Sequence, residues 1–190
     1  MFVRRWLVHR LLRLIRTKRD ETIAWLEKTP PAASYRGLLF ETGVHEKLSS
    51  KCTIDARRLG DTTRQKFNLE ESLDICYFGS EFSAAVLESG PYRISSKKNL
   101  VSIDSFYCTQ SLGQLLLFQI TVGKTHPVKG DGLVFLLKKL GMLKWVSQNK
   151  VKLIFVVPLE NVSSFKPQKI ELKQKPNNEA AYATWAILGK

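Results

Sequence analysis

The chain has 190 residues, of which 44% are hydrophobic and 25% charged, a balance typical of a folded globular protein rather than a disordered one. Its formal net charge of +13 indicates polyanionic partners, with nucleic acid first and an anionic membrane surface second. The sequence has no run of about 18 apolar residues, so we expect no transmembrane helix. Its three cysteines are too few and too far apart for a disulfide framework or a CxxC metal site.

The first 31 residues predict a basic amphipathic helix and a linker. Apolar residues recur at spacings of three and four from Phe2 to Ile15, arginines fill much of the rest, and a proline pair beginning at Pro30 ends the helix. Three interpretations stay open: a packing helix or the tail of an upstream domain, an arm that binds nucleic acid or a membrane surface, and a mitochondrial presequence. The main domain is then expected at residues 32–190.

The main domain alternates between helical and strand-like patterns. Long apolar runs suggest buried strands, and the unbroken run from Val151 to Pro158 indicates burial on both faces. The order of patterns predicts an α/β domain with a mixed central sheet flanked by helices. In chain order we expect a helix at 35–49, a strand or its approach at 69–79, a short extended piece at 91–94, and strands at 100–106 and 115–123. A helix at 132–150, a strand at 151–158, a strand or helix at 165–172 and a terminal strand at 182–188 follow.

The strands at 100–106 and 115–123 carry the residues that point most directly to chemistry. Asp104 is a lone carboxylate on the first, and Gln119 interrupts the apolar run of the second, where an unsatisfied amide is costly to bury. Glu41, on the helix at 35–49, adds a third oxygen donor. Two carboxylates and an amide oxygen suit a hard cation such as Mg²⁺ or Mn²⁺, which activates water beside a phosphate. The alternative for a lone strand Asp is a turn cap or an ion pair.

A metal-dependent phosphodiesterase site usually includes a lysine near the metal-bound water. Here the residue two positions after Gln119 is Thr121, so that lysine is missing from its expected place. Lys124 and His126 follow shortly after, and each is a candidate for the catalytic helper, although His126 has the alternative role of capping a turn. The GKT tripeptide around Lys124 is not a phosphate-binding loop, because Phe118 stands where that loop needs glycine.

Four sequence blocks carry a resemblance to a known family. They are RGLLFETGVHEKL at 36–48, SIDSFY at 102–107, LFQITVGKTHPVK at 117–129 and IFVVPLENVSSFKPQKI at 154–170. Together they resemble the C-terminal effector domain of the Crinkler family and of the related retrotransposon hot spot proteins. Those domains are similar to restriction endonucleases of the PD-(D/E)xK type. Each block is a weak signal alone, whereas four in one order make the resemblance more specific.

The resemblance implies a restriction-endonuclease-like fold and a Mg²⁺-dependent endodeoxyribonuclease. In that family pattern Glu41, Asp104 and Gln119 form the metal site, and Thr121 departs from the usual lysine. The resemblance further implies a secreted effector that enters a host cell and acts on DNA in its nucleus. Residues 1–31 look like the last helix and linker of an upstream NTPase domain.

Three functions are consistent with these features. The first is DNA cleavage largely independent of sequence, with Lys97, Lys98 and Lys129 on the phosphate backbone and a steep loss of binding with salt. The second is a catalytically degenerate nuclease fold that binds DNA or a host protein without cleavage. The third is a membrane-surface or scaffolding role led by the basic helix. Restriction-endonuclease-like domains often act as dimers, so a homodimer is a further expectation.

Overall fold

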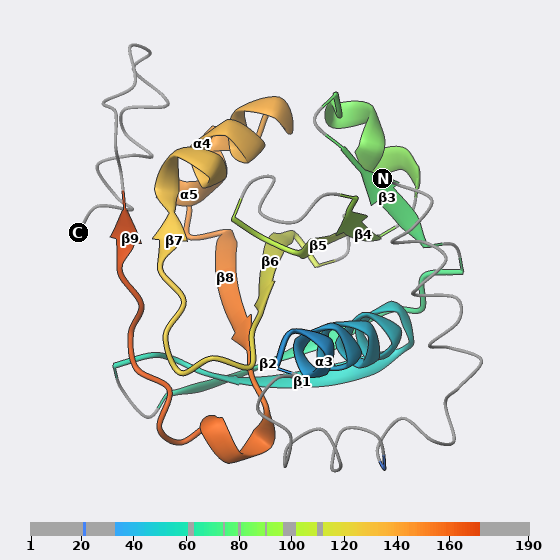
Figure 1. The fold of residues 1–190 in the computed structure, drawn as a ribbon. Helices are drawn as coiled ribbons and strands as arrows, with labels where there is room; N and C mark the ends of the chain where they lie inside the picture. Colours follow the sequence, from blue (N-terminus) through green and yellow to red (C-terminus); the bar gives the residue numbers. More distant parts are fainter. Residues whose placement is uncertain are drawn as a thin grey trace.

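The computed structural model describes residues 21, 33–60, 63–73, 75–79, 81–89, 91–96, 102–109 and 112–171 (Figure 1). Apart from Glu21, the basic helix predicted near the N-terminus lies outside the described residues, as does the strand predicted at 182–188. Lys97 and Lys98 lie outside them as well. None of the helices in the described part of the chain is both long enough and apolar enough to cross a membrane.

A five-stranded mixed sheet forms the centre of the domain. Its strand order is β3, β4, β5, β6, β8. The three middle strands are antiparallel, whereas β3 runs parallel to β4 and β8 runs parallel to β6. The strands are β3 Cys76–Phe78, β4 Tyr92–Ser95, β5 Ser105–Thr109, β6 Gln114–Ile120 and β8 Val151–Val156. The predicted α/β class with a mixed central sheet is confirmed.

Helices cover both faces of this sheet (Figure 1). On one face lies α3, Ala33–Ser49, close to the helix predicted at 35–49. On the other lie α4, Gly130–Lys139, and α5, Leu143–Ser147. The sheet therefore separates two apolar cores, and side chains of β6 enter them alternately, as the two-residue period of a strand requires. Leu115 and Leu117 pack on the α4 side, whereas Leu116 and Phe118 pack on the α3 side.

A polar hairpin beside α3 was not predicted. It consists of β1, Cys52–Arg57, and β2, Arg64–Leu69, which pair antiparallel. Most of its side chains are exposed or half-buried, and its two buried residues are Phe67 and Leu69. The segment predicted at 69–79 as a strand or its approach begins with Leu69, the last residue of β2, and contains β3, where the chain enters the central sheet.

The predicted helix at 132–150 is two helices rather than one. Leu140 ends α4 by donating its backbone N–H to Leu136 O, and Gly141 follows with φ +70°. Glycine adopts this left-handed conformation without the steric cost that a side chain would add, which is why it commonly ends a helix. The chain then turns into α5, which returns it to the start of β8.

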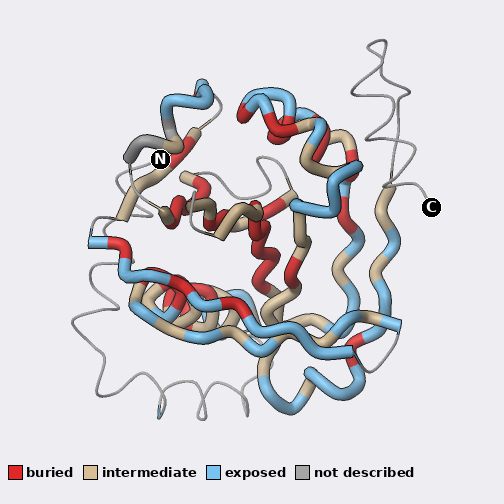
Figure 2. The backbone as a smooth tube through the Cα atoms, turned by 180° about the vertical axis from the view of Figure 1, so that it is seen from behind, coloured by how far each residue is buried: buried red, intermediate tan, exposed pale blue. Residues whose placement is uncertain are grey.

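The expectation that the strand at 151–158 is buried on both faces is wrong. β8 is the last strand in the sheet order, so its outer edge has no neighbouring strand among the described residues. Ile154 is its one buried residue, and the others are half-buried. The middle strands β4, β5 and β6 consist mostly of buried residues, which Figure 2 draws in red.

Short elements complete the described chain. β7, Val128–Lys129, pairs parallel with β9, Ile170–Glu171, so the segment predicted at 165–172 contributes a two-residue strand. Two 3₁₀ helices, η2 at Ala84–Ser89 and η3 at Leu159–Asn161, lie in the connections.

Candidate functional site

Backbone hydrogen bonds hold Asp104 in place, one residue before β5 begins. The strand predicted at 100–106 begins later, at Ser105, because Ser102 has φ +60° and turns the chain just before it. The backbone of Asp104 nevertheless forms hydrogen bonds with the strands on both sides. Its N–H donates to Phe118 O of β6 at 2.9 Å, and its carbonyl accepts from Ser95 N of β4 at 2.8 Å. This residue is thus held from both sides although it lies one position before β5.

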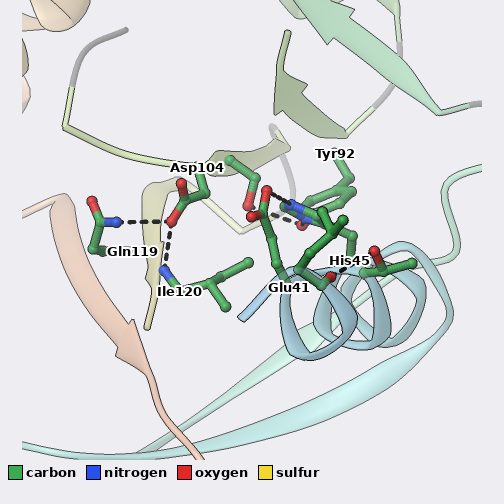
Figure 3. Close-up of polar contacts among 9 residues, drawn as sticks. Glu41, His45, Tyr92, Asp104, Gln119 and Ile120 are labelled. Carbon is green, nitrogen blue, oxygen red and sulfur yellow. Dashed lines mark hydrogen bonds and ion pairs between the residues drawn. The ribbon is translucent and has the colours of Figure 1, made fainter. Parts of the chain in front are cut away.

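The Asp104 side chain meets the next strand directly (Figure 3). Its Oδ2 accepts hydrogen bonds from Gln119 Nε2 at 2.8 Å and from the Ile120 backbone N–H at 2.7 Å. Hydrogen bonds to a charged acceptor are roughly twice as strong as neutral ones, so two donors orient this carboxylate firmly. The predicted association of Asp104 with Gln119 is present in the structure.

The other end of the Gln119 amide is left unsatisfied. The side chain is 4% exposed, and its Oε1 accepts no hydrogen bond from any residue that the structure describes. A buried acceptor without a partner costs free energy, of the order of 1–3 kcal/mol. An oxygen of this kind is a suitable ligand for Mg²⁺, and the amide's O and N are exchangeable by a flip about its last torsion.

Glu41 occupies one face of α3 together with His45, one helical turn later. His45 Nε2 lies 3.5 Å from Glu41 Oε1, and both residues are buried. Their predicted shared face is confirmed. Figure 3 shows Glu41 turned toward His45, whereas Asp104 is turned toward Gln119 and Ile120. Glu41 thus contacts His45, and Asp104 accepts hydrogen bonds from Gln119 and Ile120.

A buried chain of hydrogen bonds links the helix to the strand that follows Asp104. His45 Nδ1 lies 2.6 Å from the Tyr92 hydroxyl, which in turn donates to Ser105 Oγ at 2.9 Å. Which of the two groups donates in the His45–Tyr92 hydrogen bond depends on the imidazole tautomer. On the other side of the ring, His45 Nε2 lies toward Glu41 Oε1.

The electrostatics of Tyr92 indicate that both carboxylates lie in its vicinity. Burial raises the pKa of Tyr92 well above its usual value, the hydrogen bond to Ser105 lowers it in part, and the negative charges of Asp104 and Glu41 raise it further. Tyr92 therefore stays protonated at any physiological pH. Glu41 and Asp104, which are 63 positions apart in the sequence numbering, are brought to one region of the fold.

Replacing Tyr92 by phenylalanine tests this chain of contacts. The variant removes the hydroxyl between His45 and Ser105, so we expect a loss of about 1–3 kcal/mol in the free energy of unfolding. The measurement is urea denaturation followed by circular dichroism. Tyr35→Phe is the matched control, because Tyr35 is 47% exposed and should change stability by no more than about 0.5 kcal/mol. Equal effects of the two variants would contradict the described network.

The two candidate helpers lie in the loop after β6, and neither reaches the carboxylates. Lys124 is exposed, and within the described chain neither Lys124 nor the His126 ring forms a hydrogen bond or ion pair with Glu41 or Asp104. The backbone N–H of His126 donates to Gln168 Oε1, at 2.6 Å. Burial lowers the pKa of His126, so its ring is neutral at pH 7.

The remaining predicted residues have simpler surroundings. Thr121, at the place of the usual lysine, accepts a hydrogen bond from Gly123 N at 3.0 Å and shapes the turn after β6. Lys129 is exposed on β7, as a phosphate contact requires. Over the described ranges, no three His, Cys, Asp or Glu side chains gather closely enough to hold a metal ion. A cation at this site would need the amide oxygen of Gln119 beside the two carboxylates.

Sequence reasoning missed the buried polar residues of β4. Tyr92 and Arg93 are both 0% exposed. The Arg93 guanidinium donates to Leu87 O and lies 5.7 Å from the Phe106 ring centroid, and burial lowers its pKa. The short segment around them has no periodicity that would mark either residue as buried, so no sequence signal was available for this part of the site.

Comparisons with known proteins found no match for this chain. The chain matches no known family model, no curated protein and no solved structure. The resemblance described above therefore rests on the four sequence blocks, and the site has to be interpreted from its own chemistry.

Proposed function

We propose that this protein is a Mg²⁺-dependent nuclease with a restriction-endonuclease-like fold that hydrolyses phosphodiester bonds in DNA. The observation that carries the proposal is the contact between Asp104 and Gln119, whose buried amide oxygen has no partner in the described structure. Glu41 supplies a second carboxylate from α3. A helix carboxylate, a carboxylate before a strand and an amide on the next strand are the set that the family resemblance requires.

The chain's own groups have distinct tasks in this scheme. Asp104 and Glu41 would hold the cation as carboxylates, and the Gln119 amide would add an oxygen ligand. A cation held there would lower the pKa of a water ligand and neutralise charge on the phosphate. His45 orients Glu41 from behind, as outer partners of metal ligands usually do. His126, neutral at pH 7, or Lys124 would assist the attacking water from the loop after β6.

The charge of the chain supports DNA as the substrate. A net charge of +13 favours polyanions, and Lys129 is an exposed cation on β7. The resemblance adds the setting that we propose: a secreted effector, active in a host nucleus, with DNA as its main partner. We also propose that the protein contacts a host protein and that it acts as a homodimer.

The decisive experiment is plasmid cleavage by the purified full-length chain with Mg²⁺, with Mn²⁺ and with EDTA. We expect supercoiled DNA to be nicked or linearised with either metal and left intact with EDTA. Binding, followed by mobility shift, should weaken by roughly 10³-fold or more between 50 and 200 mM salt if six or more phosphates are contacted. Cleavage that persists in EDTA would contradict a metal-dependent mechanism.

A second candidate function is a degenerate nuclease fold that binds DNA without cutting it. Thr121 favours it, because its hydroxyl is engaged in a turn and cannot supply the positive charge of a lysine. In the same experiment this candidate is expected to give a salt-sensitive mobility shift with no metal-dependent cleavage.

A further inference from the structure

Strand β8 has the composition of a central strand but the position of an edge strand. Its sequence, VKLIFV, is apolar on both faces apart from Lys152. Exposed edges are normally protected from further pairing by charged residues, prolines, bulges or a covering segment. β8 instead ends the sheet order within the described chain, and most of its apolar side chains are half-buried.

The backbone of β8 offers hydrogen-bonding groups on its outer side. The carbonyl groups of Lys150 and Val156 accept from strand β6 and the residue after it, through Leu115 N and Thr121 N. Successive residues of a strand point their backbone groups to opposite sides. Val151, Leu153 and Phe155 therefore direct their N–H and C=O groups to the open edge.

A pocket of about 700 Å³ adjoins this strand. The whole of β8 lines one side, and the polar hairpin β1–β2 and the segment after η3 line the other. In Figure 1 the hairpin passes beneath β8. Apolar side chains such as Ile54, Phe67 and Phe165 form much of the opposite wall. An edge strand beside an apolar pocket of this size has room for an extended segment.

The charged groups of the pocket are predominantly positive. The Arg57 guanidinium donates to Val162 O and Phe165 O, at 3.0 and 2.9 Å, and Lys152 Nζ donates to the Asn149 amide oxygen at 2.8 Å. Both cations thus have neutral partners. Among the described residues of the lining, Asp55 is the one carboxylate, and it is paired at 3.2 Å with Arg64, which does not line the pocket. The pocket is therefore complementary to an anionic occupant.

We propose that β8 binds an extended acidic segment of a partner protein by strand addition, with alternate apolar side chains in the pocket and carboxylates near Arg57 and Lys152. The pocket's charge disfavours a second copy, since each chain carries +13. Residues 172–190 are also disfavoured, because they contain three lysines and one glutamate. Nucleic acid is disfavoured because it has no peptide backbone to pair with the N–H and C=O groups of β8. This inference is independent of nuclease activity.

The test uses a fluorescein-labelled ten-residue peptide of alternating Val and Glu, titrated with the full-length protein and followed by fluorescence polarisation. We expect saturable binding, and slower amide hydrogen exchange at Val151, Leu153 and Phe155 in the complex. Lys152→Glu should weaken binding about tenfold through like-charge contact. The control is Lys138→Glu, which reverses an exposed charge on α4 and should leave the affinity within about twofold.

Two peptides separate strand addition from simple charge attraction. The Val–Glu peptide with every second backbone nitrogen methylated keeps the charge but loses the donors, and it should bind at least about tenfold more weakly. A Gly–Glu peptide of equal charge should bind weakly as well, because it lacks apolar side chains. Equal binding of all three would overturn the proposal. Slow hydrogen exchange of the β8 amides in the free protein would also overturn the proposal. It would mean that residues 172–190 or a second copy already occupies the edge of β8.

Discussion

Replacement of Asp104 by alanine is expected to reduce Mg²⁺-dependent plasmid cleavage by at least about 100-fold. Even the outer partners of metal ligands typically contribute 10–100-fold to affinity or activity, so a ligand itself should contribute more. Asp104→Asn should have nearly the same effect. Asparagine keeps an oxygen that accepts from Ile120 N, which lies 2.7 Å from the native carboxylate, but it removes the negative charge. The measurement is the initial rate of plasmid nicking across a Mg²⁺ titration.

The matched control for Asp104→Asn is Asp55→Asn. Asp55 lies on the polar hairpin, half in solvent and paired with Arg64, so its replacement should leave cleavage unchanged. Mobility shift should detect similar DNA binding by wild type and both variants, since the proposed loss is in metal binding and chemistry. If Asp104→Asn cleaves as fast as wild type while Asp55→Asn does not, the site has been assigned to the wrong carboxylate.

The asparagine variant also separates chemistry from folding. Alanine at 104 leaves Gln119 Nε2 and Ile120 N without their acceptor, and each loss costs about 1–3 kcal/mol when the group is buried. Asparagine preserves at least one of these bonds. Lost cleavage in a variant that unfolds at the same urea concentration as wild type would therefore locate the defect in the metal site.

Some parts of this fold could be predicted from sequence because their signal is local. The helix at 35–49 has apolar residues at a regular spacing, and that spacing alone puts Glu41 and His45 on one face. The run around Gln119 is long and apolar, so its burial was predictable. The pairing of Asp104 with Gln119 followed from two neighbouring strands joined by a short turn, which places such residues near each other.

Other parts depend on interactions that the sequence does not display. In the hairpin β1–β2, Phe67 and Leu69 join the core on the α3 side and alternate with polar residues, but the strands are short and rich in charged residues, so the prediction missed them. The start of β5 is set by the left-handed backbone of Ser102, a conformation uncommon for serine. The contact of Tyr92 with His45 joins residues 47 positions apart, and no spacing rule relates them. Strand β8 was predicted to be buried on both faces because its sequence is apolar, but an apolar sequence does not determine where a strand lies in the sheet order.

Phe118→Ala is expected to lower the free energy of unfolding by about 3–5 kcal/mol, the usual range for removing a buried aromatic side chain. Phe118 is 0% exposed on β6, and its ring lies 6.3 Å from that of Tyr92, centroid to centroid. Its loss would leave a cavity in the core between the sheet and α3. The measurement is the midpoint and slope of urea denaturation, with stability taken from their product.

Phe135→Ala is the control, because Phe135 is 42% exposed on α4 and contacts Phe82 with ring centroids 6.3 Å apart. It should change stability by about 1 kcal/mol or less. A similar loss for both variants would contradict the buried position of Phe118. Because Phe118→Ala removes a side chain and keeps the backbone bond to Asp104 N, the folded fraction should retain metal-dependent cleavage. Opposite outcomes for Phe118→Ala and Asp104→Asn would then separate the residues that hold the sheet together from those that perform the chemistry.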